Sequence, residues 1–194
     1  MKLILTRHGE TVDNIKGILQ GQNPGKLSEN GIQQAKQLAL RLKNENIDAI
    51  YSSDLARAAD TAKEIYKFHP KIPLYFVKEL REGDCGSFTG KKESEIDWKK
   101  RPDDAESLNN MQKRVRIILE AVFEKHKNQT ILFVGHNGIN KSLVTVINNL
   151  PAHDLSEIDH FDQTSISIFD IQKNQNQTIL FNSVDHLKQS PKYS

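Results

Sequence analysis

Two histidines and two arginines stand close behind apolar runs of the chain, and this placement suggests chemistry. Arg7 and His8 follow the first run, Arg57 lies a few residues beyond the second, and His136 closely follows the third. In an open α/β sheet, the ligand crevice forms just past the carboxyl ends of the strands. A neutral imidazole can act as a nucleophile near pH 7 and carry a covalent group. We therefore predict that His8 faces a substrate in such a crevice.

The elements that must position these side chains alternate along the chain between strands and helices. This alternation predicts an α/β fold, a three-layer, open, mostly parallel sheet with helices on both faces. The predicted strands lie at residues 3–5, 48–51, 130–134, 165–169 and 178–181. The first three of them would end next to the residues that carry the candidate chemistry.

Arg57 belongs to a predicted helix that begins soon after the second strand. Asp54 is expected to cap this helix. Its apolar face would consist of Leu55, Ala58, Ala62 and Ile65. Arg57 then falls in the first turn, where free backbone amides and the positive end of the helix dipole favour an anion. The pattern therefore predicts an anion site that includes Arg57.

Apolar residues at helical spacing predict further helices. Ser28 can cap one of them, with the inward residues Ile32, Ala35, Leu38 and Leu42. A long helix is expected from about Ala105 to Lys127, with the inward residues Met111, Val115, Ile118, Leu119 and Val122. Another helix is expected to follow His136.

The composition fits a single enzyme domain, residues 1–194, with a small insertion. The chain has 194 residues, of which 37% are hydrophobic, and can bury a sizeable core. The net charge of +2, from 27 basic and 25 acidic residues, gives no basic excess that would suggest a nucleic-acid partner. Cys85 is the only cysteine, which excludes an internal disulfide and a multi-thiolate metal site and fits a reducing compartment.

The sequence contains no pattern of a secretory signal or a membrane anchor. The first apolar run is short and is followed by charge at Arg7, so it is too short for a signal-peptide core. The apolar stretch at residues 142–150 is far below the roughly 20 residues that a membrane span needs. We therefore predict a cytoplasmic protein with no membrane partner. Nothing in the sequence indicates an oligomeric state.

Several short motifs follow one another in order along nearly the whole chain. They are Arg7-His8-Gly9-Glu10-Thr11 with Asn14, Gln20-Gly21-Gln22, Ser52–Ala62, Leu80-Arg81-Glu82, Glu106-Ser107, Gly135-His136-x-Gly138 and Ser183-x-x-His186. The series resembles the histidine phosphatase superfamily, the phosphoglycerate-mutase-like proteins, and specifically its small phosphatase branch. The chain departs from many relatives at Phe88-Thr89-Gly90, where they have Trp-Glu-Gly. That departure concerns the choice of substrate and not the class of reaction.

The resemblance implies a phosphomonoesterase that hydrolyses a small phosphorylated metabolite through a phosphohistidine at His8, with no metal and no other cofactor. Arg7, Arg57 and His136 would stabilise the transferred phosphoryl group, because its negative charge is spread over three oxygens. Glu82 would act as general acid on the leaving alkoxide and then as general base on water. The resemblance further implies that the phosphate site is lined by Asn14, Gln20, Gly21 and Asn137.

A charged segment at about residues 91–104 is predicted to form a lid over the crevice. Its densest basic run is Lys99, Lys100 and Arg101. We expect this run to favour substrates with a second anionic group. A solvated charged surface explains such a run equally well.

Two other functions would use the same residues. A phosphoglycerate mutase, an isomerase, would return the phosphoryl group to the substrate, but such mutases usually carry Trp where Asp13 stands. A binding module with a vestigial site is disfavoured because every charge that the chemistry requires is present. Within the site, Asp84 is the natural competitor for the role of Glu82.

Other motifs of the sequence are incomplete. A cysteine-dependent phosphatase would have Arg six residues after Cys85, where Lys91 stands. The pair Gly90-Lys91 lacks both the preceding glycine and the following Ser or Thr of a P-loop. His8, Glu10 and His136 could in principle hold a metal, but the arginine beside His8 argues against this.

Overall fold

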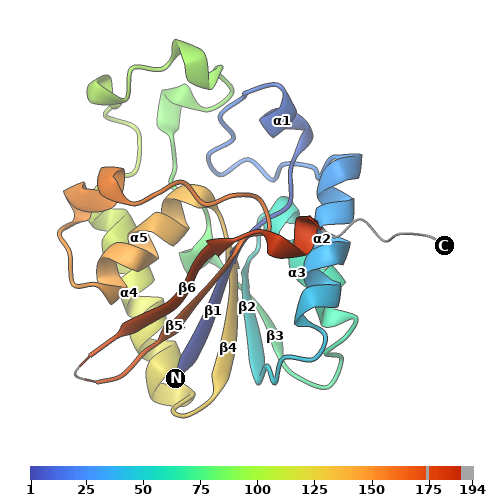
Figure 1. Cartoon of the computed structure of the whole chain (residues 1–194). Coiled ribbons are helices and arrows are strands. Elements are labelled where there is room, and N and C mark those ends of the chain that lie inside the picture. Colours follow the sequence, from blue (N-terminus) through green and yellow to red (C-terminus); the bar gives the residue numbers. More distant parts are fainter. Residues whose placement is uncertain (174, 189–194) are drawn as a thin grey trace.

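The computed structural model describes residues 1–173 and 175–188, which form a six-stranded sheet with helices on both faces (Figure 1). In chain order the strands are β1 (Lys2–Arg7), β2 (Ala49–Ser53), β3 (Leu74–Val77), β4 (Thr130–Gly135), β5 (Ile166–Asp170) and β6 (Gln177–Ser183). Their order in the sheet is β3-β2-β4-β1-β5-β6. The first four in this order run parallel to one another, and β5 and β6 pair antiparallel. The predicted α/β fold with a mostly parallel sheet is confirmed.

Two pairs of helices cover the two faces of the sheet. One face carries α2 (Glu29–Leu42) and α3 (Ala56–Tyr66), and the other carries α4 (Leu108–Lys125) and α5 (Asn137–Ile147). Successive side chains of the central strands point alternately to the two helix layers. Leu3 and Leu5 pack toward α4 and α5, whereas Ile4 packs toward α2 and α3. This alternation follows from the period of two along a strand, and it explains why these strands are apolar almost throughout.

The three strand ends that carry the candidate chemistry are neighbours. Strands β2, β4 and β1 are adjacent and parallel, so their carboxyl ends lie at the same edge of the sheet. Arg7 is the last residue of β1, and His136 directly follows β4. Arg57 lies in the first turn of α3, which begins soon after β2. The predicted meeting of three strand ends is therefore confirmed.

The predicted cap of α3 is wrong. The N-cap of this helix is Leu55, with no side-chain hydrogen bond. The Asp54 carboxylate instead accepts two hydrogen bonds from Arg81, from Nε and Nη2, each at 2.6 Å. A bidentate pair with a guanidinium is stronger than a hydrogen bond to a neutral backbone amide. The long-range partner therefore replaces the local one.

Two details of the other predicted helices also differ. Ser28 does cap α2, but Ile32 of this helix is 38% exposed instead of inward. Gly31 is the residue that faces the protein there, and the next residue lies about 100° around the helix. Helix α4 begins after its Ser107 cap and not at Ala105, because the preceding Glu106 N–H donates to the Asp84 carbonyl.

Strand β3 and the short helix α1 (Val12–Ile15) were not predicted from the sequence. Strand β3 is a short apolar run, Leu74–Val77, at the edge of the sheet, and its side chains are half-buried or exposed. Helix α1 belongs to a lobe, which we define as residues 12–25 and 86–104, above the carboxyl edge of the sheet (Figure 1). The two segments of the lobe are joined by backbone hydrogen bonds, including Leu19 N–H to the Lys91 carbonyl at 2.9 Å.

Two glycines allow α2 to approach the chain directly after His8. A Cβ added to Gly31 would lie 1.9 Å from the Glu10 carbonyl oxygen, and one added to Gly9 would lie 2.5 Å from the Gly31 carbonyl oxygen. Ser28 strengthens the contact, because its backbone N–H donates to the Glu10 carbonyl at 2.9 Å and its hydroxyl donates to the Glu10 carboxylate at 2.6 Å. The start of α2 therefore fixes the backbone beside His8.

We expect Gly31→Ala to destabilise the protein, because the added methyl group meets backbone atoms that cannot move aside without displacing residues 9–10. The expected loss is roughly 2–3 kcal/mol, the upper part of the range for overpacking. Thermal unfolding followed by circular dichroism should show it as a lower Tm. Asn30→Ala, an exposed change in the same helical turn, is the control and should leave Tm nearly unchanged. Equal Tm values for both variants would contradict the close contact.

Candidate active site

A cavity of about 570 Å³ opens at the carboxyl edge of the sheet. The charged and polar side chains on its wall include Arg7, His8, Asn14, Gln20, Arg57 and Glu82. His136 is fully buried directly beside it, with its ring centroid 5.1 Å from that of His8. The structure therefore brings together the residues that the sequence analysis assigned to catalysis.

The His8 ring is buried and neutral, with its proton on Nδ1. Nδ1 lies 2.7 Å from the Gly9 carbonyl oxygen and donates to it. Nε2 therefore keeps its lone pair and accepts from Arg57 Nε at 3.2 Å. Burial lowers the pKa of His8 well below its usual value, and the charges of Arg57 and Arg7 lower it further. The ring is thus unprotonated at neutral pH, and a neutral imidazole can act as a nucleophile.

Arg57 is a buried cation, 1% exposed, that is held mainly by backbone carbonyls. The loop 21–24 provides these acceptors, including Gly21, which accepts from Nη2 at 2.8 Å. The Nε–H is shared between His8 Nε2 at 3.2 Å and His136 Nδ1 at 3.1 Å. Burial lowers the pKa of Arg57 to about 10, so it remains charged at pH 7. Its charge can therefore stabilise a bound anion.

His136 is the N-cap of α5 and presents a free donor. Because its Nδ1 accepts from Arg57, its proton lies on Nε2. Among the described residues this Nε2–H has no hydrogen-bond partner. Burial lowers the pKa of His136 well below its usual value, and the charge of Arg57 adds to the effect. A buried donor without an acceptor costs free energy, so an acceptor from a ligand would be favoured here.

Arg7 adds a second buried cation. Its Nη1 donates to the Phe161 carbonyl at 2.6 Å and lies 3.5 Å from His160 Nε2. Its Nε is buried and has no partner in the part of the chain that the structure describes. Burial lowers the pKa of Arg7, and the charge of Glu82 opposes this shift. Two guanidinium groups therefore flank the neutral ring of His8.

Glu82 lies on the cavity wall at the N-terminal end of α5. Its Oε2 accepts from the backbone N–H of Gly138 at 3.0 Å, and its Oε1 accepts from Ile139 at 2.9 Å and from Gly83 at 3.0 Å. Amides at the start of a helix favour a carboxylate both by hydrogen bonding and by the helix dipole. The Glu82 carboxyl group is therefore fixed beside Gly138 and Ile139, two and three residues after His136.

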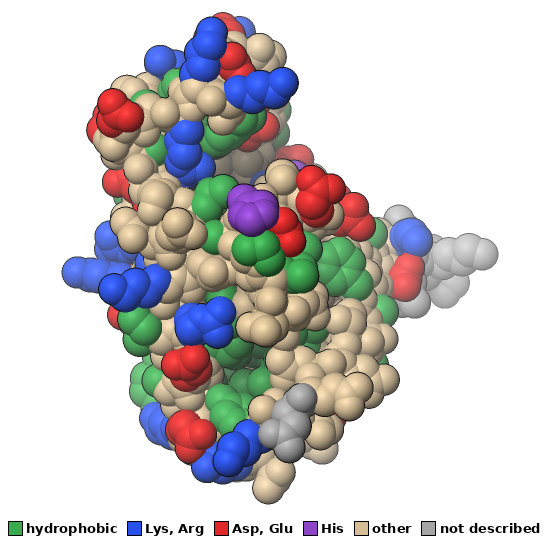
Figure 2. Space-filling view, turned by 90° about the vertical axis from the view of Figure 1, so that its left-hand side faces the viewer, with side chains coloured by type: hydrophobic (Ala, Val, Ile, Leu, Met, Phe, Trp, Pro, Cys, Tyr) green, Lys and Arg blue, Asp and Glu red, His purple; other side chains and the backbone are tan. Residues whose placement is uncertain are grey.

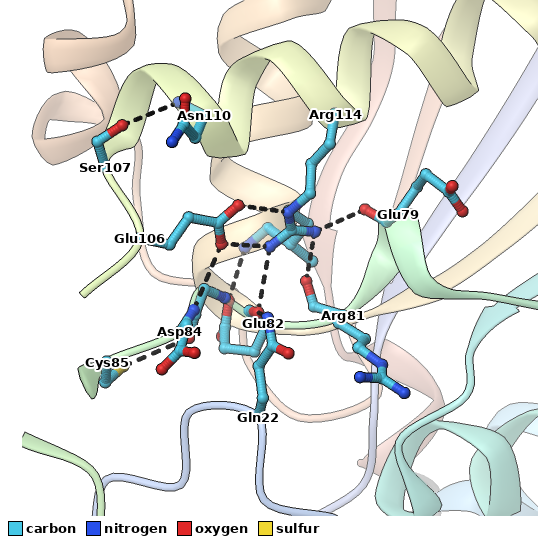
Figure 3. Close-up of polar contacts among 12 residues, drawn as sticks. Gln22, Glu79, Arg81, Glu82, Asp84, Cys85, Glu106, Ser107, Asn110 and Arg114 are labelled. Atoms are coloured by element: carbon cyan, nitrogen blue, oxygen red, sulfur yellow. Dashed lines mark hydrogen bonds and ion pairs between the residues drawn. The ribbon is translucent and has the colours of Figure 1, made fainter. Parts of the chain in front are cut away.

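Arg114 of α4 holds the backbone that carries Glu82, as Figure 3 shows. Its Nε and Nη2 donate to the Glu106 carboxylate at 2.7 and 2.8 Å. Its Nη1 donates to the carbonyls of Glu79 and Arg81, each at 2.7 Å, and its Nη2 donates to that of Glu82 at 3.1 Å. All five N–H donors of the guanidinium are thereby used. Arg114 and Glu106 together clamp the segment 79–82.

The sequence analysis missed Arg114, although the sequence contains a signal for it. Arg114 lies three residues after Met111, so it borders the apolar stripe of α4. A charged residue at the edge of such a stripe is rarely buried unless it is paired. Glu106 was noted only as part of a motif, and the structure shows that it is the paired acid.

Two predicted phosphate ligands of the lobe meet at Thr11. Asn14 Oδ1 accepts from the Thr11 backbone N–H at 3.1 Å, and Gln20 Nε2 donates to the Thr11 hydroxyl at 2.9 Å. Both Asn14 and Gln20 line the cavity. The Gln20 Oε1 is buried and unpartnered among the described residues.

The other two predicted phosphate ligands also support the arginines. Gly21 lines the cavity and holds Arg57 through its carbonyl. Asn137 lines the cavity as well, and its Oδ1 accepts from the Phe161 N–H at 2.9 Å. The carbonyl of Phe161 in turn accepts from Arg7. Asn137 therefore contacts the residue that positions Arg7.

The structure separates the predicted basic run of the lid. Arg101 lines the cavity and donates from Nη2 to the Glu106 carbonyl, whereas the exposed Lys99 and Lys100 do not line it. Lys100 instead lies 3.7 Å from Asp97. Figure 2 shows basic and acidic side chains intermixed on the lobe, with a hollow below it. For Lys99 and Lys100, the interpretation as a solvated surface fits this arrangement better.

Asp84 and Cys85, which the sequence analysis considered as a rival acid and as a cysteine nucleophile, lie close to Glu82 in sequence but in different surroundings. Asp84 is exposed and does not line the cavity, and its carboxylate accepts from the Gly86 N–H at 2.9 Å. Cys85 lines the cavity, but burial and the charge of Glu82 raise its pKa to about 11. Its thiol is therefore protonated at neutral pH and a poor nucleophile.

Residues 1–173 and 175–188 contain no group of three or more His, Cys, Asp and Glu side chains placed to hold a metal ion. In particular, the Glu10 carboxylate accepts from the Ser28 hydroxyl at 2.6 Å. Within the same residues, none of the helices is both long and apolar enough to cross a membrane.

Residues 3–184 match the family described as the histidine phosphatase superfamily (branch 1). The chain belongs to this superfamily. By class it is a phosphatase, a hydrolase of phosphoric monoesters. The resemblance drawn from the ordered motifs is thus confirmed.

Three similar proteins illustrate the relationship. Phosphoserine phosphatase 1 of Hydrogenobacter thermophilus is 34% identical, over 96% of this chain and 94% of its own length. The metal-independent phosphoserine phosphatase of Arabidopsis thaliana is 36% identical, over 73% of this chain and 66% of its own length. The solved structure of Bacillus stearothermophilus YhfR superposes with a TM-score of 0.87 at 28% identity, covering 96% of this chain and 98% of that one.

We expect Arg114→Met to destabilise the protein, because three carbonyls and the Glu106 carboxylate would lose their donors. The expected loss is roughly 2–4 kcal/mol, near the scale for breaking a buried ion pair. Urea unfolding would measure it. Lys113→Met, an exposed change on the same helix, is the control.

A double-mutant cycle with Glu106→Gln tests whether the pair acts as a unit. The two losses should be non-additive by at least about 1 kcal/mol, because each variant already breaks the same contact. Additive losses would show that Arg114 and Glu106 act independently and would contradict the clamp.

Proposed function

We propose that the chain hydrolyses small phosphorylated metabolites through a covalent phosphohistidine at His8, without a metal ion. The observation that carries this proposal is the hydrogen bonding of the His8 ring. Its Nδ1–H donates to Gly9, and its Nε2 lone pair lies among the charges of Arg7 and Arg57. Attack on a phosphate dianion needs a neutral nucleophile and fixed positive charge around it.

In the first step, His8 Nε2 attacks the phosphorus while the bond from phosphorus to the ester oxygen breaks. Arg7, Arg57 and the free Nε2–H of His136 bind the oxygens on which negative charge develops. The Arg57 Nε–H, which contacts His8 Nε2 in the free protein, then donates to a phosphate oxygen. The products of this step are phosphohistidine and the alcohol.

Glu82 moves the protons in both steps. In its protonated form it gives a proton to the leaving alkoxide, and as a carboxylate it then takes one from the attacking water. The attack breaks the phosphorus–nitrogen bond, which restores His8 and releases phosphate. The support for this role is that Glu82 lines the cavity and that Arg114 and α5 hold it in place.

The metal-free part of the proposal rests on charge. Arg7 and Arg57 place two positive charges beside His8, and a bound divalent cation would supply the same charge in other phosphatases. The Arabidopsis relative, whose name states that it is metal-independent, supports this part of the proposal.

The proposal includes a lid at residues 91–104, inserted in one phosphatase domain. Trp98 and Arg101 of this segment line the cavity. The segment is also joined to the other part of the lobe, residues 12–25, by the Glu93 N–H, which donates to the Gly17 carbonyl at 2.8 Å. A substrate bound at His8 would therefore contact it.

We expect a phosphoenzyme when the protein is mixed with a labelled phosphate ester and quenched. The bound phosphate should be labile in acid and stable in base, as a phosphoramidate is, and excess chelator should not reduce its formation. His8→Ala should abolish it. His153→Ala, an exposed histidine outside the cavity wall, is the control.

The same experiment separates the alternatives. A mutase would transfer the phosphoryl group to a second metabolite instead of water, and a vestigial binding module would form no phosphoenzyme. Full turnover by His8→Ala would exclude the covalent mechanism. Loss of activity on chelation that added metal restores would contradict metal independence.

We expect Glu82→Gln to slow phosphorylation by alkyl phosphates by roughly 10²–10⁴-fold, the range typical of general acid catalysis. An alkoxide leaves poorly without a proton, whereas a nitrophenolate needs little help, so nitrophenyl phosphate should lose much less. Single-turnover rates are the measurement, because Glu82 also acts in the second step. Equal losses for both esters would mean that Glu82 only positions the substrate, and Asp84→Asn would then be tested.

A further inference from the structure

Apart from the charged groups around His8, much of the cavity wall is apolar. Six apolar side chains from separate parts of the chain contribute to it: Ile18, Leu19, Trp98, Leu108, Met111 and Leu155. Met111 belongs to the core on the α4 and α5 face, and the partly buried Leu108 and Leu155 pack against that core. The mechanism at His8 uses none of them.

The apolar side chains of the lobe have no place in the hydrophobic interior. Among the described residues, Ile18, Leu19 and Trp98 belong to neither core, and Trp98 is 50% exposed. The Trp98 ring packs nearly perpendicular to the ring of Phe88, with 6.0 Å between the ring centroids. Ile18 and Leu19 are half-buried, and apolar side chains that gather around a cavity outside the core, instead of being scattered, mark a surface for a ligand.

The packing of Met111 places this wall beside the proposed general acid, and the sequence position of Leu19 places it beside the proposed phosphate site. A Cβ added to Gly83, the residue after Glu82, would lie 2.8 Å from Met111 Sδ, so Met111 packs beside the acid that protonates the leaving oxygen. On the lobe, Leu19 directly precedes Gln20 and Gly21 of the phosphate site. The apolar wall is therefore continuous with the site at His8.

We propose that this wall binds the alcohol part of the substrate, and that this part is an apolar group of several carbon atoms. This inference rests on the proposed function, because the phosphate must lie at His8. A cavity of about 570 Å³ is in the size range of pockets that enclose drug-sized ligands, so it has room for more than a phosphate.

The charged residues farther along the wall favour the apolar assignment over a second anionic group. Arg101 already donates to the Glu106 carbonyl, and the carboxylate of Glu93 also lines the cavity. Lys141 is half-buried on the wall; burial lowers its pKa, and the charges of the nearby Asp159 and Glu157 oppose this shift. Acidic groups thus accompany the cations, and a preference for phosphoserine or 3-phosphoglycerate is the competing outcome.

A series of primary alkyl phosphates from ethyl to hexyl tests the inference by kinetics. The leaving alkoxides are chemically alike, so a change in kcat/KM along the series reports burial of the chain. We expect kcat/KM to rise by up to about fourfold per methylene, equivalent to about 0.8 kcal/mol. Trp98→Ala should flatten the series, and Trp98→Phe should restore most of it.

Two variants serve as matched controls for the loss at Trp98. Glu95→Ala changes an exposed residue of the same segment, and Ile117→Ala removes an exposed apolar side chain of α4, both outside the cavity wall. Neither should alter the dependence on chain length. A flat or falling series in the unmodified protein, or faster hydrolysis of phosphoserine than of hexyl phosphate, would overturn the inference.

The fluorescence of Trp98, the only tryptophan of the chain, gives a second readout that needs no turnover. In His8→Ala, hexyl phosphate should shift the emission to shorter wavelength, because the alkyl chain replaces water at the ring. Ethyl phosphate and inorganic phosphate should not. A blue shift without hydrolysis of any ester by the unmodified protein would refute the proposed function alone, whereas hydrolysis without a blue shift would refute the apolar wall alone.

Discussion

The burial of one positive charge, the guanidinium of Arg57, constrains the rest of the site. Removing a charge from water costs several kcal/mol unless other groups replace the lost hydrogen bonds. The loop 21–24 provides carbonyl acceptors, and two histidine rings accept from Nε. Those rings can accept only while they are neutral, and their burial beside the charge keeps them so. The proposed nucleophile, His8, and the proposed anion site around Arg57 are thus one arrangement.

Rigidity around this charge comes from both layers of the fold. On one face, α2 contacts the backbone after His8 so closely that only glycine fits at position 31. On the other face, Arg114 fixes the carbonyls around Glu82, and the first amides of α5 fix its carboxyl group. The positions of His8 and Glu82, the proposed nucleophile and acid, are therefore fixed by helices that pack on opposite faces of the same sheet. Such preorganisation lowers the cost of reaching a transition state.

The sequence predicts the parts of this arrangement that depend on local pattern. Apolar runs identify the central strands, so Arg7, His8 and His136 can be placed at strand ends. The prediction that Asp54 caps α3 is wrong because its actual partner, Arg81, is distant in sequence. The contacts of Arg114 cannot be predicted in the same way, because it binds backbone carbonyls, which every residue has. In the segment 91–104, Trp98 and Arg101 line the cavity while Lys99 and Lys100 do not, because residues three apart lie on the same side of the three-residue turn that begins at Trp98.

The cavity has a charged part, which we call the floor, around Arg7, His8 and Arg57, and the apolar wall described above. The two parts depend on the fold in different ways. The floor stands at the ends of buried strands, so a change there also disturbs a core. Much of the wall belongs to the lobe, whose side chains Ile18, Leu19 and Trp98 pack into neither core of the described residues. A substitution at Ile18 or Trp98 can therefore alter the fit of the proposed alcohol group while the folded sheet and the charges around His8 stay in place. Reaction class and substrate choice are separable for this physical reason.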